Sequence, residues 1–347
     1  MSWQPQLCIY TANVKRTKCY FIKNTKLSEL DLIAKLKNRF PSHIGDDAAV
    51  IQFTDEQSYI VTKDIIVEDV HFCTSYFDPL SLAHKALHVN LSDVAAMGAT
   101  PLFVLGGISI PMLHQEYAKE FLHNFADMCE NTGIKLIGGD ITASRDRIFI
   151  SVTIIGVART KAIKYRCTAK PTNIICVVGE LGYAHLGLIA CEKSLSEFGL
   201  YKKPFLRPTA KTKEGIWLAE QDAVTCMMDI SDGLLVDLRK LCKASDAKGV
   251  IDLELLNPSI AFREDCAILG LDCMDVMLTG GEDYGLLCAI DVEKLHCFAK
   301  DFAKIFGYPM KRIGYITNGS GICFVNNGLW KNKKLKPFSH FGESTEF

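Results

Sequence analysis

Hydrophobic residues recur along the chain with two spacings, and the two alternate from about residue 28 onward. Leu30, Ile33 and Ala34 have the i, i+3, i+4 spacing of an amphipathic helix, and Ser28 followed by Asp31 resembles a capping box in front of it. Other runs are rich in β-branched residues and predict strands. We therefore expect helices at 28–39, 79–97, 115–131, 183–198, 209–224, 232–245 and 292–306, and strands at 58–62, 103–109, 134–138, 148–158, 173–178, 226–229, 250–255, 310–316 and 321–325.

The alternation of strands with helices favours an α/β fold with mixed α+β layers over an all-helical or all-β fold. A polar and basic segment, RTKAIKYRCTAKPTN at 159–173, interrupts the apolar pattern and predicts a domain joint. The first 26 residues contain no acidic residue and no clear period. We therefore expect an N-terminal extension at 1–26, an N-terminal domain at 27–160 and a C-terminal domain at 161–347.

Composition argues against several classes of protein. With 48% hydrophobic and 23% charged residues, the chain has the make-up of a soluble globular protein rather than a disordered one. A formal net charge of −1 gives no support for a nucleic-acid or anionic-membrane partner, because counterion release needs a clustered basic surface. The most apolar stretch, at 100–113, is too short to span a membrane, and no continuous apolar run of a signal peptide occurs at 1–26. We expect a cytoplasmic protein.

The chain has 14 cysteines, yet no two of them have the CxxC spacing. Several lie inside apolar runs, such as Cys176 in IICVVG and Cys288 in LLCAI. We therefore expect buried, reduced thiols rather than a disulfide framework or a structural zinc site.

The feature that indicates chemistry is a set of acidic residues at the ends of apolar runs, beside glycine or other small residues. An unpaired carboxylate buried there is costly, and burial otherwise raises its pKa until it is protonated. Since few Lys or Arg flank these segments, we expect hard cations to neutralise them, and Mg²⁺ takes one or two carboxylates together with substrate phosphates. For any single segment a turn or helix-cap role is more common, so it is the repetition in one chain that favours a metal site. The segments are IGDDAAV with Asp46 and Asp47, IVTKDIIVEDVHF with Asp64, NLSDVAAMGA with Asp93, LIGGDIT with Asp140, MMDISDGL with Asp229 and Asp232, and LTGGEDY with Glu282 and Asp283.

Within the helix expected at 79–97, Asn90 and Asp93 are neighbours on one face, which also carries Ala86 and Met97. A mostly apolar face with one amide and one carboxylate indicates a buried polar site, provided that something neutralises the carboxylate. A simple buried hydrogen bond is the alternative.

Six segments, IGDDAAV, VEDVHF, NLSDVAAMGATP, LIGGDIT, DISDGL and LTGGEDYGLL, resemble in this order the motifs of the thiamine-monophosphate kinase family. The similarity covers residues 44–287 and continues more weakly to Phe338. The broader superfamily, which includes aminoimidazole ribonucleotide (AIR) synthetase, selenophosphate synthetase and the hydrogenase maturation ATPase, shares only part of this set. The resemblance implies a two-domain AIR synthase-like architecture, with an N-terminal domain at the core of a homodimer and a C-terminal α/β domain. It also implies ATP and thiamine monophosphate as substrates and several Mg²⁺ ions.

The resemblance assigns site residues one by one. Substrate-contacting positions fall on His71, Glu282 and Phe338, and nucleotide positions fall on Gly139, Asp140, Arg166 and Ser231. Metal positions fall on Asp47, Thr62, Lys63, Asp64, Asp93, Asp140, Asp229 and Asp232. Among these, we expect catalysis to depend on Asp47, Asp93, Asp229, Asp232 and Arg166. Without the resemblance, His71 beside Phe72 would be interpreted as a core residue.

The chain has no GxxxxGK[ST] phosphate loop, so cations must do more of the work of holding phosphates. The phosphate of thiamine monophosphate is already ionised and needs no general base, and repulsion between two anions dominates the barrier. We expect direct in-line transfer without a phosphoenzyme, with Mg²⁺ ions and Arg166 offsetting the negative charge.

Three residues depart from the family pattern. Lys63 stands where a small hydroxyl residue is usual, Asp69 where glycine is usual, and Gly285 where glutamate is usual. A lysine ammonium would displace one Mg²⁺ unless the ligand at this position is the backbone carbonyl. His84 and His88 have the i, i+4 spacing of a metal-binding pair, but no acidic third ligand stands beside them, and we expect them on a helix surface.

Other activities remain as alternatives. Selenophosphate synthesis would need a reactive cysteine in a Gly-rich N-terminal segment, and neither Cys8 nor Cys19 lies in one. LTGGEDYGLL favours the kinase over AIR synthetase. A catalytically silent nucleotide-binding protein is the alternative from another class, and the intact carboxylates argue against it.

Overall fold

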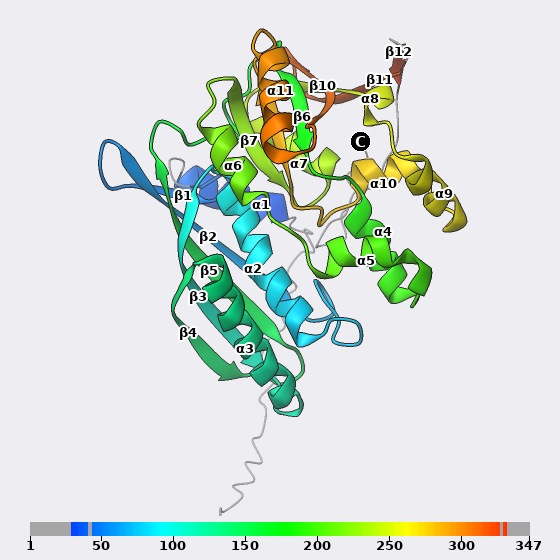
Figure 1. The fold of residues 1–347 in the computed structure, drawn as a ribbon. Helices are drawn as coiled ribbons and strands as arrows, with labels where there is room; N and C mark the ends of the chain where they lie inside the picture. Colours follow the sequence, from blue (N-terminus) through cyan, green and yellow to red (C-terminus); the bar gives the residue numbers. More distant parts are fainter. Residues whose placement is uncertain (1–28, 41–43, 327–328, 332–347) are drawn as a thin grey trace, which may run out of the picture.

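The computed structural model describes residues 29–40, 44–326 and 329–331. In this part of the chain two β-sheets form, and helices cover them in layers (Figure 1). The fold class expected from the sequence, α/β with mixed layers, is therefore confirmed. The predicted extension at 1–26 and the predicted substrate residue Phe338 lie outside the described residues.

The first sheet has five strands in the order β1-β2-β5-β3-β4. Neighbouring strands are antiparallel except β3 and β4, which run parallel. Buried residues alternate with more exposed ones along β2 and β5, because one face of this sheet packs on a core. The strands are β1 (Ala49–Gln52), β2 (Gln57–Val67), β3 (Thr100–Ile110), β4 (Lys135–Ala143) and β5 (Phe149–Arg159).

Two helices, α2 (Pro79–Ala96) and α3 (Gln115–Thr132), lie side by side over one face of this sheet (Figure 1). The Asp78 side chain caps α2 by accepting a 2.6 Å hydrogen bond from the backbone N of Ser81. Pro79 occupies the first turn, where a missing N–H costs nothing. Helix α1 (Glu29–Arg39) precedes this group, and the 3₁₀ helix η1 (Met112–His114) leads directly into α3.

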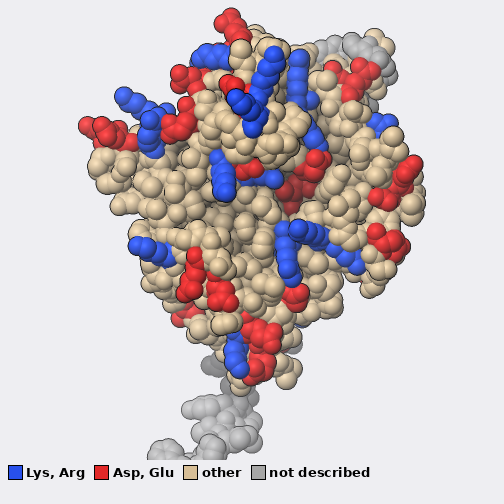
Figure 2. All heavy atoms as spheres, in the orientation of Figure 1, with Lys and Arg blue, Asp and Glu red and all other residues tan. Residues whose placement is uncertain are grey.

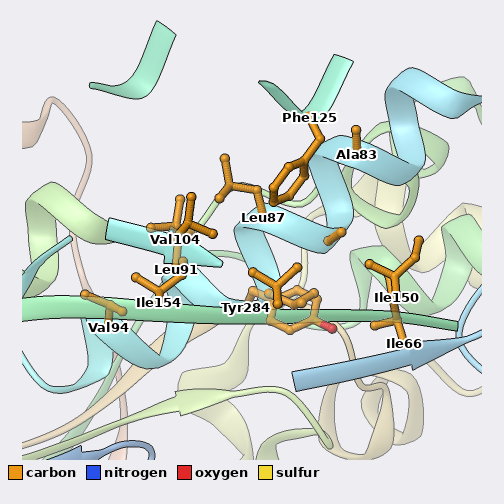
Figure 3. Packing of buried hydrophobic residues seen from close by; sticks show 14 of the residues in the cluster. Ile66, Ala83, Leu87, Leu91, Val94, Val104, Phe125, Ile150, Ile154 and Tyr284 are labelled. Carbon is orange, nitrogen blue, oxygen red and sulfur yellow. The ribbon is translucent and has the colours of Figure 1, made fainter. Parts of the chain in front are cut away.

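The face of α2 that points to the sheet is apolar. Leu87 and Leu91 pack near Phe125 of α3 and Val104 of β3 (Figure 3). Full burial of such a side chain stabilises the fold by about 1.5–3 kcal/mol. This contact fixes α2 over the sheet, and with it the polar residues on the other faces of the helix.

The second sheet has the order β12-β11-β8-β10-β6-β9-β7, with β11 and β8 parallel and the other pairs antiparallel. The central strands β6 and β9 are buried at every position, since helices cover both faces. The strands are β6 (Ile174–Val178), β7 (Val224–Ile230), β8 (Lys248–Asp252), β9 (Gly285–Ile290), β10 (Lys311–Thr317), β11 (Gly321–Asn326) and β12 (Leu329–Lys331).

Each face of the second sheet has its own hydrophobic cluster. Ile174 and Cys176 of β6 belong to the cluster with α6 and α11, and Ile175 and Val177 belong to the cluster with α4, α7, α9 and α10. All cysteines in the described part of the chain are free thiols. The helices are α4 (Tyr183–Glu192), η2 (Ser196–Phe198), α5 (Gly199–Leu206), α6 (Thr212–Ala219), α7 (Leu234–Ala244), α8 (Leu253–Leu256), α9 (Ile260–Ile268), α10 (Cys273–Thr279) and α11 (Leu295–Phe306).

Several predicted elements were wrong in their bounds. The helix expected at 183–198 ends at Glu192, because Ser194 adopts a left-handed φ of 55°, and a separate helix, α5, follows although it contains Pro204. The strand expected at 250–255 ends at Asp252, whose side chain caps α8. The helix expected at 209–224 ends five residues early, at Ala219. No element was expected at the positions of β1, β9, β12, η1, α5, α9 and α10.

Among the described helices, none is both long enough and apolar enough to cross a membrane.

Candidate active site

A cavity of about 940 Å³ is lined by residues from both halves of the chain. The N-terminal half contributes the segment before β1, strand β2 and helix α2, and the C-terminal half contributes the end of β7, helix α7 and the segment after α10. Most of the site residues predicted from the sequence line this cavity: Asp47, Thr62, Lys63, Asp64, His71, Asp93, Arg166, Asp229, Ser231, Asp232 and Glu282.

Three carboxylates converge in the cavity. Asp47, Asp93 and Asp229 each offer one oxygen, and these oxygens all lie within 4.8 Å of one another. Oδ2 of Asp47 is buried and has no hydrogen-bond partner. Hard oxygen donors at this spacing, one of them unsatisfied, fit a divalent cation such as Mg²⁺. The three residues lie far apart in the sequence and are brought together by the fold.

Hydrogen bonds hold two of these carboxylates. The Thr62 hydroxyl donates to Asp93, and the Ser92 hydroxyl donates a 2.8 Å hydrogen bond to Oδ2 of Asp229. Asn90 accepts a 3.0 Å hydrogen bond from the backbone N of Asp64 through its Oδ1. On the polar face of α2 predicted from Asn90 and Asp93, Asn90 is therefore buried and Asp93 is half-buried; both are hydrogen-bonded, and Asp93 also belongs to the carboxylate cluster.

Burial is the main cause of raised pKa values in this cluster, and neighbouring carboxylates add to it. The pKa of Asp93 lies well above its ordinary value, because of burial and then of the charges on Asp64, Asp229 and Asp47. Burial also raises the pKa of Asp47 well above its ordinary value, against the opposing effect of Arg166. The pKa values of Asp64 and Asp229 rise to about 6, again mainly through burial. A bound cation would favour the ionised form of each carboxylate and reverse these shifts.

Arg166 enters the cavity from the segment that joins the two halves. Its guanidinium pairs with Asp47, and its Nε lies 3.5 Å from Oδ1 of Asp46. The backbone N of Arg166 also donates to the Asp46 carboxylate. Asp46 therefore orients Arg166, a role that neither the carboxylate pattern nor the family resemblance gave it.

A second basic residue, which the sequence motifs did not indicate, pairs with two carboxylates beside this cluster. Nζ of Lys240 on α7 lies 2.6 Å from Asp232 and 2.8 Å from Asp237. Few basic residues flank the carboxylate segments in the sequence, but the fold brings Lys240 and Arg166 to them, so cations are not the only charges that offset these carboxylates. The signal in the sequence was the i, i+3 pair of Asp237 and Lys240 in the helix after DISDGL.

Asp237 fixes the loop at the end of β7. One of its oxygens accepts hydrogen bonds of 3.0 Å from the backbone N atoms of both Ser231 and Asp232. Its side chain is fully buried, and burial raises its pKa to about 7 despite the neighbouring Lys240. Gly233 follows with a φ of 104°, and a Cβ there would lie 2.9 Å from the carbonyl O of Gly280. Only glycine allows the two loops to approach this closely.

Lys63 lines the cavity, but its ammonium lies elsewhere. Thr62 and Asp64 share one face of β2, and strand alternation places the Lys63 side chain on the other face. There its Nζ donates a 2.5 Å hydrogen bond to the Ser151 hydroxyl. The ammonium is thus not positioned to displace a cation, and the main-chain carbonyl is the atom of Lys63 that fits a ligand role.

The other two departures from the family pattern have structural reasons. Asp69 adopts a φ of 64°, which suits the usual glycine, and its carboxylate pairs with Arg147 at 2.7 Å. At Gly285 a Cβ would lie 2.6 Å from the carbonyl O of Val178, so the usual glutamate would require a shift of the strand.

Gly139 and Asp140 lie apart from the cavity-lining residues, on the outer strand β4. Asp140 is exposed. Gly139 sits where β4 approaches β3 so closely that a Cβ would lie 1.8 Å from the carbonyl O of Gly106. Within one copy of the chain, these two residues are not brought together with the other predicted nucleotide residues.

The histidines differ in their surroundings. Nδ1 of His71 accepts a 3.1 Å hydrogen bond from the backbone N of Val67, which places the ring proton on Nε2. His84 and His88 stack with ring centroids 4.1 Å apart and are half-buried rather than on an open helix surface. Burial lowers their pKa values to about 4 and about 3, so both rings are neutral near pH 7.

Family models match most of the chain. Residues 45–158 match the model described as AIR synthase related protein, N-terminal domain, and residues 170–325 match its C-terminal domain. The thiamine-monophosphate kinase of Escherichia coli (strain K12) is 32% identical over 327 residues, which cover 90% of this chain and 98% of the relative. The chain belongs to the thiamine-monophosphate kinase family. The family recognised from the six motifs, the two-domain AIR synthase-like architecture and the expectation of a kinase are thereby confirmed.

Other members of the thiamine-monophosphate kinase family agree with this assignment. The enzyme of Bacillus subtilis (strain 168) is 30% identical over 303 residues, or 84% of this chain and 91% of the relative. The solved structure of AaThiL complexed with AMPPCP and TMP is 30% identical, covers 95% of this chain and 100% of its own, and superposes with a TM-score of 0.79. Hydrogenase maturation protein HypE of E. coli, 20% identical with a TM-score of 0.65, shares the fold. The exact domain boundaries, 27–160 and 161–347, stay a prediction.

Proposed function

We propose that this protein transfers the γ-phosphoryl group of ATP to thiamine monophosphate, giving thiamine diphosphate, with several Mg²⁺ ions as cofactors. The observation that carries the proposal is the convergence of Asp47, Asp93 and Asp229 in a cavity that is large enough for two ligands. Membership in the kinase family supports it, as does the similarity to a structure that holds an ATP analogue and TMP.

The residues that would hold the ions are the converging carboxylates together with Thr62, Asp64, Asp232 and the Lys63 carbonyl. Asp140, on β4, lies apart from them. When bound, Mg²⁺ ions supply the positive charge that offsets repulsion between the donor and acceptor phosphates. Ser92 and Thr62 orient Asp229 and Asp93 for this task. Arg166 pairs with one oxygen of Asp47 and offsets part of its charge. The other oxygen, Oδ2, has no hydrogen-bond partner and is the atom that fits a cation.

The remaining residues bind and orient the two phosphates. Arg166, fixed by Asp46, carries a charge that can contact the polyphosphate. The backbone amides of Ser231 and Asp232 are used by Asp237, so this loop offers the Ser231 hydroxyl and the Asp232 carboxylate to ligands instead. His71 and Glu282 line the same cavity and form the acceptor side.

We propose direct in-line transfer without a covalent phosphoenzyme. The acceptor phosphate is ionised near neutral pH, so no side chain has to remove a proton from it. The site is rich in carboxylates that would be needed as cation ligands, and a carboxylate that coordinates a cation is a poor nucleophile. Incubation with radiolabelled ATP alone should leave the protein unlabelled.

We further propose a homodimer that covers β4. Every residue of β4 is exposed, including Leu136, Ile137 and Ile141 at 45%, 52% and 64%. An exposed apolar edge strand promotes aggregation unless another chain covers it. A second copy at this edge would also place Gly139 and Asp140 in an interface rather than in water.

We propose that the protein binds small-molecule substrates rather than nucleic acid or a membrane. On the face drawn in Figure 2, basic and acidic side chains are interspersed, and no continuous basic surface forms there. We propose a cytoplasmic location for this reaction.

One assay tests the proposed function. The protein is incubated with ATP, Mg²⁺ and thiamine monophosphate, and thiamine diphosphate is quantified by chromatography. Asp93→Asn keeps the shape of the side chain and removes its charge, and should lower kcat by about 100-fold or more. Asp127→Asn, on the exposed side of α3, is the matched control and should retain activity. Absence of product with the unmodified protein would reject the proposed function.

A further inference from the structure

A fully buried lysine links the two residues assigned to the acceptor side. The Lys85 side chain, on α2, is 1% exposed, and its Nζ lies 2.6 Å from Oε1 of Glu282. The same Nζ donates a 2.9 Å hydrogen bond to the carbonyl O of His71. Nothing in the motifs pointed to Lys85, because Glu282 follows it only much later in the chain.

Aromatic rings close the remaining side of this ammonium. Nζ of Lys85 lies 4.6 Å from the ring centroid of Phe205 and 5.2 Å from that of Phe77. Such contacts favour a desolvated cation but do not replace an anionic partner. A buried ammonium is costly unless it is paired and hydrogen-bonded, so the Glu282 carboxylate is held to it.

The backbone of the Glu282 loop is fixed independently. Glu282 has a left-handed φ of 67°, and its N donates a 2.7 Å hydrogen bond to the carbonyl O of Ser231. Asp283 accepts hydrogen bonds from the backbone N atoms of Gly182 and Ala184 at the start of α4. Tyr284 packs into the hydrophobic cluster around α2 (Figure 3). Only the direction of the Glu282 side chain is left for Lys85 to determine.

The Glu282 side chain is 27% exposed and lines the cavity, so its second oxygen is within reach of a ligand. His71 reaches the cavity from the turn after β2. Lys85 therefore joins an N-terminal and a C-terminal residue of the same cavity through one atom, and it does not itself line the cavity.

We propose that Lys85 is a positioning residue for the acceptor: its buried ammonium holds the Glu282 carboxylate and the His71 turn at a fixed separation, and so sets the affinity for the phosphorylated acceptor rather than for ATP. This inference rests on the proposed function. The carboxylates that would hold the nucleotide's metal ions have no contact with Lys85 among the interactions described above, and Asp93, which shares helix α2 with Lys85, lies about two turns further along it.

Steady-state kinetics of Lys85→Met test this inference. Methionine keeps the length and apolar stem of lysine and removes the charge. The KM for thiamine monophosphate should rise by about tenfold or more, because truncating one member of a buried charge pair leaves the other unpaired. The KM for ATP should stay within about twofold. Lys85→Arg keeps the charge and should show a smaller rise.

Two comparisons separate positioning from a general loss of structure. Lys164→Met removes a half-buried lysine that donates to the Gln221 carbonyl outside the cavity, and should leave both KM values unchanged. In the double variant Lys85→Met, Glu282→Gln, the KM for thiamine monophosphate should match that of Glu282→Gln alone, since both changes remove the same contact. If Lys85→Met does not fold, the KM values of Lys85→Arg for thiamine monophosphate and for ATP are compared in the same way.

An unchanged KM for thiamine monophosphate, or equal rises for both substrates, would overturn the role of Lys85. So would effects of the two substitutions that multiply in the double variant. Failure of the proposed function would show differently, as an unmodified protein that forms no thiamine diphosphate.

Discussion

Ser92 of α2 and Asp229 of β7, which stand 137 residues apart, are joined by a 2.8 Å hydrogen bond inside the protein. Ser92 is fully buried and Asp229 is 3% exposed. The bond ties the N-terminal half to the C-terminal half at the place where the carboxylates converge. The position of Asp229 in the cluster therefore depends on both halves.

Ser92→Ala should lower the free energy of unfolding by about 1–3 kcal/mol, because it leaves a buried carboxylate oxygen without its donor. Urea unfolding followed by circular dichroism measures this. Ser81→Ala on the same helix is the control: its hydroxyl accepts from Arg207, whose side chain is 40% exposed and can bond to water instead. Equal losses for the two variants would show that Ser92 has no special role.

Lys240→Met should lower the free energy of unfolding by about 3–5 kcal/mol, because Asp237 is completely buried and would lose the ammonium group that pairs with it. Asp237→Asn in the same chain should recover part of this loss. The comparison is Lys311→Met, which breaks an exposed pair with Glu180 and should cost less than about 1 kcal/mol. Similar costs for Lys240 and Lys311 in urea unfolding would contradict the structure.

The metal-free protein should become less stable as pH rises from about 4 to about 6. Burial raises the pKa of Asp64 and Asp229 to about 6 in the folded protein, against about 4 in an unfolded chain. Between these values the folded state binds more protons than the unfolded state, so the free energy of unfolding falls with rising pH.

Thermal unfolding in EDTA across this range measures the pH effect. Mg²⁺ should raise Tm more at pH 8 than at pH 5, because it binds the ionised carboxylates. Asp229→Asn should reduce both effects. A Tm in EDTA that increases steadily from pH 4 to pH 6 would contradict the assignment.

Substitution on β4 tests the dimer. Ile141→Asp places a charge on the exposed outer strand and should convert a dimer to a monomer in sedimentation velocity. Leu113→Asp, at a residue that is 96% exposed on η1, is the control and should leave the dimer intact. A monomeric unmodified protein would remove the basis for the proposed interface.

Elements with strong local signals were predictable from the sequence. The helix expected at 79–97 agrees with α2 to within a residue, because its cap at Asp78, its Pro79 and its apolar face all point to the same structure. The Asn90 and Asp93 pair followed from helical spacing alone. The carboxylate segments that were singled out as chemically important do converge, apart from Asp140 on β4.

Features that depend on distant contacts were not predictable. The helix expected at 183–198 ends early because Ser194 adopts a left-handed φ of 55°, and α5, which follows, packs against α4. Lys85 gave no signal as a counter-ion, since its partner Glu282 is brought to it by tertiary structure. The LTGGEDYGLL motif was recognised for its residues, while its conformation, with left-handed Glu282 and Tyr284, emerges only from its contacts with the loop after β7.

A crystal structure with Mn²⁺, a non-hydrolysable ATP analogue and thiamine monophosphate would test the metal role of the converging carboxylates, because anomalous scattering locates the metal. We predict Mn²⁺ peaks within ligand distance of Asp47, Asp93 and Asp229, between the two sets of phosphates. Mn²⁺ bound only to the nucleotide, with these three carboxylates contacting protein and water alone, would show that they do not form the metal site.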